Sequence, residues 1–153
     1  MMLDKSGRTH IAAMSDKEIA QVRSIEEVML TYPQVDLSFD HLIHGGMYAR
    51  TVSVPANLMM SGALIKTQTI LIICGEVEMY TNGGVKVLEG YHVIPASAGR
   101  KQVFLTKKET LITMILATQA MTVEDAEKDF TDEHDRLADS QCYRNSNTII
   151  TGE

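Results

Sequence analysis

Cysteine is scarce in this sequence, and no cysteine stands in a metal-binding pattern. The two cysteines, Cys74 and Cys142, lie far apart and form neither a C-x-x-C motif nor a Cys/His cluster. Neither a disulfide framework nor a zinc finger is therefore expected. Cys74 lies in the apolar run ILIIC, where a free cysteine is typically a small buried hydrophobe rather than a reactive thiol.

Long apolar runs and targeting signals are also missing. No stretch approaches the roughly 18 apolar residues of a membrane span, and the N-terminal residues MMLDKSGRTHIAAM lack the apolar core of a secretory signal. We therefore expect a cytoplasmic protein without a membrane partner. The length of 153 residues suits one domain, and 44% hydrophobic with 22% charged residues is ordinary for a soluble globular chain.

The sequence lacks the short motifs of common enzyme and nucleic-acid-binding classes. It contains no G-x-S-x-G, P-loop or Rossmann fingerprint. It also has no recognisable helix-turn-helix, zinc-finger or RNA-recognition signature and no dense basic stripe. Duplex nucleic acid is therefore not an expected partner.

The formal net charge of -6 is unevenly distributed. Basic residues outnumber acidic ones in residues 47 to 120, whereas acidic residues dominate before and after this part. The basic middle indicates either an anion-binding site or solvated lysines at turns and strand edges. The second interpretation is the one we favour for Lys86, Lys107 and Lys108.

Two capping boxes predict an N-terminal helical segment over residues 14 to 34. Ser15 with Glu18, and Ser24 with Glu27, each place a hydroxyl three residues before a glutamate. These signals predict either one interrupted helix or two short ones.

Residues 35 to 120 are predicted to form a β-barrel. They contain short runs rich in Val, Ile, Thr and Tyr, separated by turn residues such as Gly75 and Gly90, with no helical pattern between them. Such spacing favours an antiparallel barrel or sandwich. Asn82-Gly83 predicts a type I′ hairpin that pairs residues 76 to 81 with residues 85 to 89.

An acidic helix is predicted near the C-terminus, over residues 121 to 140. Thr122 is a typical N-cap, and acidic residues follow it near the positive end of the helix dipole. The helix has a thin apolar face, which suits a clamp or an interface better than a core. Residues 1 to 13 and 141 to 153 have little to bury and are predicted to be disordered.

A series of glycines and prolines in the middle of the chain resembles a known family. Pro55, Gly75-Glu76-Val77, Gly84, Gly90, Pro95 and Gly99 are similar to the cupin superfamily, and more closely to the small cupin-like proteins of tailed bacteriophages. The resemblance covers residues 47 to 119, about half of the chain. It implies a phage-encoded protein with a single jelly-roll barrel. In that family, His and Glu side chains near two such motifs hold a divalent metal inside the barrel.

The metal ligands of that family are missing here. Residues 55 to 73 contain no His, Asp, Glu or Cys. The family's motifs place Gln68 where the ligand Glu would stand and Gln102 where the second-motif His would stand, although the spacing from Pro95 to Gly99 is longer than in the family. Amides can hydrogen-bond a ligand but are poor metal ligands and poor general bases. The resemblance thus implies no metal, no cofactor and no catalytic residue.

Three histidines offer an unconventional alternative. His41 and His44 are close in sequence, and His92 stands at the start of a predicted strand. No carboxylate or cysteine motif completes a ligand set with them, so structural roles are favoured. A metal-dependent cupin enzyme that uses these ligands remains an open alternative.

Arg50 is the main candidate for contact with a ligand. Strand alternation in YARTVSV puts Tyr48 and Arg50 on the same face as the two valines that follow. If those valines face the barrel interior, the guanidinium needs a buried anionic partner. That partner is either a ligand or a protein carboxylate, such as Glu76, Glu78 or a C-terminal acid.

Three functional interpretations follow. The leading one is a non-enzymatic cupin-like protein that binds a small polar or anionic ligand and sequesters a host metabolite or nucleotide signal. Its expected ligand-binding residues are Tyr48, Arg50, Gln68 and Gln102. The second is an oligomeric structural or interaction protein, either a homo-oligomer or a part of a virion. The third is the metal-dependent enzyme described above.

Overall fold

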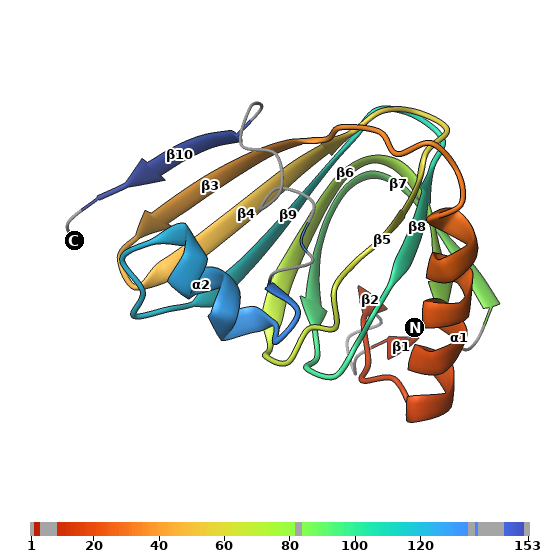
Figure 1. The fold of residues 1–153 in the computed structure, drawn as a ribbon, viewed down its shortest axis with the longest axis horizontal. Helices are drawn as coiled ribbons and strands as arrows, with labels where there is room; N and C mark the ends of the chain where they lie inside the picture. The colour runs from red at the N-terminus through yellow and green to blue at the C-terminus, as the bar shows by residue number, and fades with distance from the viewer. Residues whose placement is uncertain (1, 4–8, 82–83, 135–136, 138–145, 152–153) are drawn as a thin grey trace.

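One curled, mainly β sheet makes up the body of the protein. The computed structural model describes residues 2–3, 9–81, 84–134, 137 and 146–151. Eight strands are joined in the order β10-β3-β4-β9-β6-β8-β5, with β7 paired to β6 beside this path. The sheet bends into a half-barrel, with α1 at one side and α2 against its inner face (Figure 1). The predicted fold class, a mainly β jelly-roll-like chain with a helix toward each end, is confirmed.

In the described part of the chain, the strands follow one another with no helix between β3 and β9, as the turn spacing predicted. The helices are α1 (Asp16–Met29) and α2 (Val123–Phe130). The strands are β1 (Met2–Leu3), β2 (Thr9–His10), β3 (Ser38–His44), β4 (Met47–Val54), β5 (Met59–Ser61), β6 (Thr69–Thr81), β7 (Gly84–Ala96), β8 (Val103–Thr106), β9 (Thr110–Ala117) and β10 (Ser146–Ile150).

Strand alternation separates an apolar inner face of the sheet from a mixed outer face. In β9 every second residue from Thr110 to Leu116 is buried, and β3 shows the same alternation. Because side chains point to opposite faces of a strand in turn, each strand contributes one face to the core. Cys74 falls on the outer face of β6 and is exposed, so the prediction of a buried cysteine is wrong.

The predicted hairpin is present and is longer than predicted. Residues 76 to 81 pair with residues 84 to 89, as the turn signal indicated, although the turn residues 82–83 lie outside the described residues. Gly75 and Gly90 do not end strands. They lie opposite each other inside β6 and β7, with φ of 150° and 90°. Glycine tolerates these backbone angles, so both strands bend together instead of breaking.

Helix α1 begins at the first predicted capping box. The Ser15 hydroxyl accepts from the Glu18 N–H, and the Glu18 carboxylate accepts from the Ser15 N–H. The second predicted cap is wrong. Ser24 lies within the helix, where its hydroxyl donates to the Ala20 carbonyl, because a serine inside an uninterrupted helix bonds backward along it.

Helix α2 begins at Thr122 as predicted but is shorter than predicted. The Thr122 hydroxyl accepts from the Asp125 N–H, and the helix ends at Thr131, whose backbone is extended. Ala126 and Phe130 are buried in the core. The expected helix to residue 140 is therefore wrong for the described residues after Thr131, while residues 135–136 and 138–140 lie outside the described part.

Both termini contain strands where disorder was predicted. Thr9–His10 forms β2, and Ile11 is buried and bridges to Ala96 of β7. Ser146–Ile150 forms β10, which pairs in parallel with β3. These segments bury or pair backbone at the sheet edges, which their short local sequences do not indicate. The rest of the two predicted disordered segments lies largely outside the described residues, including Cys142.

Candidate functional site

Tyr48 and Arg50 lie on the inner face of the sheet, as alternation predicted. Tyr48 is fully buried, and the Arg50 side chain is 10% exposed. The Arg50 Nη1 atom lies 3.3 Å from Oε2 of Glu127 on α2, so a C-terminal acid is a partner of the guanidinium. The guanidinium also lies over the rings of Phe39 and Phe130, at 4.6 and 5.6 Å from their centroids.

A buried histidine joins this group. Nδ1 of His41 lies 2.7 Å from the Tyr48 hydroxyl, and His41 is 4% exposed. The two residues reach each other because β3 and β4 are paired with Ile43 opposite Tyr48 and His41 opposite Arg50. His41 is thus one of the polar residues on the inner face, in keeping with the structural role that the sequence analysis favoured over metal binding.

The two predicted glutamines differ in burial. Gln68 is exposed just before β6, where alternation points Thr69 and Leu71 inward, so it does not line the interior. Gln102 is 6% exposed and lies in a run of buried residues from Arg100 to Phe104, a core residue of β8. Within the described part of the chain, the Gln102 amide makes no side-chain hydrogen bond.

Arg100 is the inner-face residue that the sequence interpretation missed. It is 2% exposed, its Nη1 donates to the Ser97 carbonyl at 2.8 Å, and its Nη2 donates to the Thr69 hydroxyl at 2.7 Å. Among the described residues it forms no ion pair with a carboxylate. Burial lowers the pKa of Arg100 to about 10, a value at which it remains charged at neutral pH.

The local sequence gives little signal for Arg100. It follows Gly99 in a turn-like stretch outside the strands and pairs with Ile65 through an isolated bridge. Residues 100 to 104 are all buried, so alternation does not separate two faces there.

Arg50 and Arg100 both lie beside Met114 of β9. Arg50 is paired opposite Met114, and the Arg100 Nη2 atom lies 3.9 Å from the Met114 sulfur. Arg50, through its register with Met114, and Arg100, through its contact with the Met114 sulfur, therefore belong to the same inner face of the sheet. One of them has an ion-pair partner in Glu127. The region offers hydrogen-bond donors to an oxyanion.

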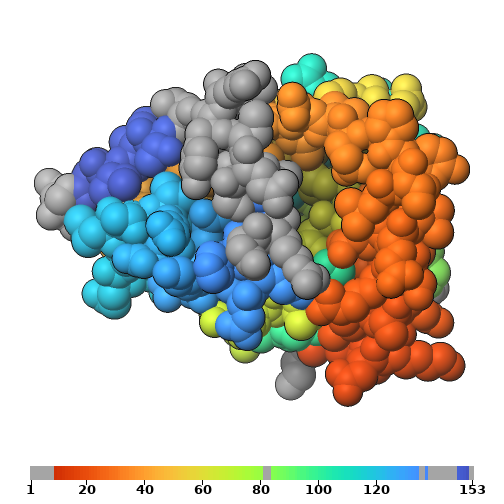
Figure 2. All heavy atoms as spheres, viewed as in Figure 1, coloured from red at the N-terminus to blue at the C-terminus, as the bar shows by residue number. Residues whose placement is uncertain are grey.

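The inner face opens on one side of the molecule. Figure 2 shows sheet atoms in a recess beside α1 and the chain that follows it. The described residues after α2 lie along this opening. The backbone N–H of Lys66 donates to the Phe130 carbonyl, and the side-chain ammonium of Lys66 lies 2.7 Å from the Asp132 carboxylate.

An ionic cluster fastens α1 beside the opening. The Lys101 ammonium, 2% exposed, lies 2.9 Å from Glu26 of α1, and Arg23 of α1 lies 2.8 Å from Glu133. Burial alone would raise the pKa of Glu26. Hydrogen bonds from Lys101 and Ser61, together with the charges of Lys101 and Arg23, outweigh it and lower that pKa below its usual value. This cluster is balanced in charge and structural.

The three histidines of the alternative metal site are separated. His41 and His44 face opposite sides of β3, and His44 bonds to Thr151. His92 lies on β7, where its Nε2 is 2.8 Å from the Glu89 carbonyl oxygen. Within the described residues, no three His, Cys, Asp or Glu side chains are grouped so that they could hold one metal ion.

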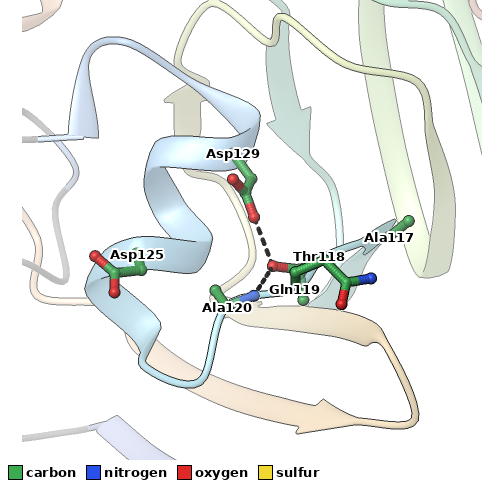
Figure 3. A pocket seen from close by; sticks show the side chains of 6 residues that line it. All are labelled: Ala117, Thr118, Gln119, Ala120, Asp125 and Asp129. Carbon is green, nitrogen blue, oxygen red and sulfur yellow. Dashed lines mark hydrogen bonds between the residues drawn. The ribbon is translucent and has the colours of Figure 1, made fainter.

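A shallow pocket lies elsewhere, between the end of β9 and α2. It has a volume of about 490 Å³ and is lined by Ala117, Thr118, Gln119, Ala120, Asp125 and Asp129. Figure 3 shows the Thr118 hydroxyl donating to Asp129 and accepting from the Ala120 N–H. Its only charged side chains are two carboxylates, so it does not favour an anion.

Comparisons with known proteins reach only solved structures. No family model and no curated protein matches the sequence. Similar structures include KdgF from Halomonas sp. (11% identity, 58% of this chain and 86% of that one, TM-score 0.47). A cupin superfamily protein from Desulfitobacterium hafniense (12%, 57% and 83%, 0.46) and the cupin domain of Cnp3 from Schizosaccharomyces pombe (18%, 65% and 72%, 0.44) are also similar. Likeness at these levels concerns the course of the strands and not a ligand.

The described helices are too short or too polar to cross a lipid bilayer.

Proposed function

We propose that this protein is a non-enzymatic, cupin-like binding protein whose curled sheet holds a small polar or anionic molecule. The observation that carries the proposal is Arg100, a buried guanidinium that forms no ion pair with a described carboxylate. An unpaired buried charge is costly, and an oxyanion that accepts charge-assisted hydrogen bonds would remove much of that cost.

Three further features support the same site. Gln102 is buried beside Arg100 in sequence and makes no side-chain hydrogen bond with described residues. Tyr48 and Arg50 lie on the same inner face, and Arg50 is paired in register with Met114, whose sulfur lies beside Arg100. Gln68 is exposed and plays no part in the proposed site. A buried polar side chain that lacks a protein partner commonly has a water or a ligand as its partner.

Thermal-shift screening of wild-type protein tests the proposal, with a panel of carboxylates, sugar phosphates and nucleotides. A binder at about 100 times its Kd adds about 2.7 kcal/mol to the free energy of unfolding and raises Tm. We expect at least one member to raise the Tm of the wild type and to have little effect on Arg100→Met.

The matched control is Lys66→Met, which removes one positive charge from an exposed lysine paired with Asp132. It should respond to the ligand as the wild type does. Arg100→Lys keeps the positive charge. If the ligand does not raise the Tm of Arg100→Met, this variant tests whether the cause is a disturbed fold or the missing charge at the site. A panel without any stabilising member, or equal stabilisation of Arg100→Met, refutes the proposal.

The biological setting is part of the proposal. The sequence resemblance to phage cupin-like proteins suggests sequestration of a host metabolite or nucleotide signal in the host cytoplasm. The nucleotides in the panel test for a nucleotide signal. A sequestering protein must bind its ligand without converting it. Recovery of the ligand unchanged after incubation is the expected result, and conversion to a product would favour the enzyme alternative.

A second candidate function, self-association, is favoured by the outer face of the sheet. Ile70, Tyr91, Val93 and Leu111 are between 41% and 67% exposed. Strand register places them together, because Tyr91 and Leu111 both pair with Cys74 and Val93 pairs with Ile72. Contiguous exposed apolar residues of this kind are typical of interaction surfaces. We propose a second copy of the chain as the partner.

A further inference from the structure

We infer that the ligand is a monocarboxylate with an apolar body, bound through its carboxylate to Arg100 and through one polar contact to Gln102. The inference rests on the proposed binding function and narrows its ligand class. It is carried by the charge, the free donors and the apolar surroundings of Arg100.

The charge of the described inner face matches one negative charge. Arg50 already has the carboxylate of Glu127 at 3.3 Å, and Gln102 is neutral. Arg100 contributes one positive charge that no described carboxylate balances. A monoanion neutralises that charge, whereas a phosphate dianion would leave a net negative charge in a buried region, which is unfavourable.

The hydrogen bonds of Arg100 leave donors for an oxyanion. A guanidinium has five N–H donors in one plane. The Ser97 carbonyl and the Thr69 hydroxyl each accept from one of them, at 2.8 and 2.7 Å, and the Met114 sulfur accepts a weaker bond from Nη2 at 3.9 Å. The remaining two, one on Nη1 and the Nε–H, can donate to carboxylate oxygens. Ser97 and Thr69 also hold the group in place, so little order is lost on binding.

The Arg100 guanidinium reaches the apolar core on one side. Its Nη2 lies 3.9 Å from the sulfur of Met114, and Met114 is paired opposite Leu71 on β6. Phe104, two residues after Gln102, belongs to the core together with Met114 and Leu71. A ligand held at Arg100 therefore contacts apolar groups with the rest of its body. A sugar or polyol would bury hydroxyls without enough partners.

Isothermal titration calorimetry with matched ligands tests the inference. Benzoate, phenyl phosphate and benzamide share one apolar body and differ only in the polar group, and hexanoate, hexyl phosphate and hexanamide provide a second body. At pH 7.5 we expect one of the two carboxylates to bind with 1:1 stoichiometry. Its affinity should be at least roughly tenfold higher than that of the phosphate and the amide with the same apolar body. Arg100→Met should lose this preference, and Gln102→Leu should bind a few-fold more weakly.

A pH series separates charge from shape. A phosphate monoester has a second pKa of about 6, so it becomes a monoanion as the pH falls to 5. The phosphate should therefore gain affinity between pH 7.5 and 5.5, whereas the carboxylate should change little. A lack of such a gain would contradict the charge argument.

The outcomes distinguish the inference from the function on which it rests. Binding of phosphates, nucleotides or sugars that depends on Arg100 and exceeds that of the carboxylates overturns the inference and leaves the binding function standing. If neither the wild type nor Lys66→Met shows binding that depends on Arg100, both the inference and the proposed binding function are overturned. Carboxylate binding that survives Arg100→Met places the ligand elsewhere and also overturns the inference.

Discussion

Gly75 is in contact with the backbone of the strand beside it. A Cβ added to Gly75 would lie 2.8 Å from the Glu109 carbonyl oxygen and from the Thr110 Cα, and closer still to the Thr110 hydroxyl. Its φ of 150° is also unfavourable for other residues. We expect Gly75→Ala to lower the free energy of unfolding by roughly 2–4 kcal/mol, from overpacking and backbone strain together. Chemical denaturation measures the change.

Gly90 provides the matched control. It lies opposite Gly75 in the hairpin and also has a positive φ, but an added Cβ would meet no atom within 4 Å. Gly90→Ala should therefore carry only the backbone term, about 1 kcal/mol. Equal losses in the two variants would show that the contact with Glu109 and Thr110 is unimportant.

The residues of the site illustrate what alternation can and cannot predict. The inward facing of Tyr48 and Arg50 followed from the pattern of one strand. Gln68 was placed by counting back from Gly75 in a family motif, and the strand's own alternation points it outward. Arg100 lies in an irregular stretch, and its burial depends on Thr69 and Met114 from distant strands, which local sequence does not reveal.

At the level of elements, α1 should be held more firmly at neutral than at acid pH. The pKa of Glu26 is lowered in the folded protein, so its carboxylate contributes stability above the unfolded pKa near 4.5 and loses it as the pH falls through the folded value. We expect Glu26→Gln to be less stable than wild type at pH 6 to 7, with the difference shrinking toward pH 3. Urea denaturation at a series of pH values measures it.

Glu27→Gln is the control for that series, since Glu27 is exposed on the same helix. It removes the same charge without disturbing Lys101 or Ser61. Its stability should follow that of the wild type across the pH range. A parallel pH dependence of wild type and Glu26→Gln would mean that the cluster does not hold α1.

The predictability of an element follows the range of its contacts. The caps at Ser15 and Thr122 and the β6–β7 hairpin are determined by neighbouring residues, and the sequence predicted all three. The strand β10 exists because it pairs with β3, and α2 stops where Phe130 and Thr131 enter the packed interior. Such long-range causes leave no local pattern, so both features were missed.

For the whole molecule, the exposed outer face predicts a dimer. Between Val85 and Val93, the described residues pair β7 with β6 alone, so one edge of β7 remains open beside the apolar residues. Open edges and apolar faces favour association. Light scattering should give twice the 17.0 kDa chain mass, and Val93→Lys should give one chain.

Val28→Lys is the control for the dimer. Val28 is 59% exposed and lies on α1 instead of on the strands of the apolar outer face. This variant should keep the mass of the wild type. A wild-type mass of one chain at high concentration, or dissociation by Val28→Lys instead of Val93→Lys, would reject the outer face as the interface.

The hairpin of β6 and β7 also bears on how the chain acquires its shape. Its two strands are only two residues apart in the sequence, whereas Ser146 of β10 pairs with Phe39 of β3, far away along the chain. Short loops close at little entropic cost, and contacts between distant residues form slowly. Refolding should therefore start from the hairpin, onto which β9 and β8 add at either side of Gly75, and β10 should be the last strand acquired and the first released.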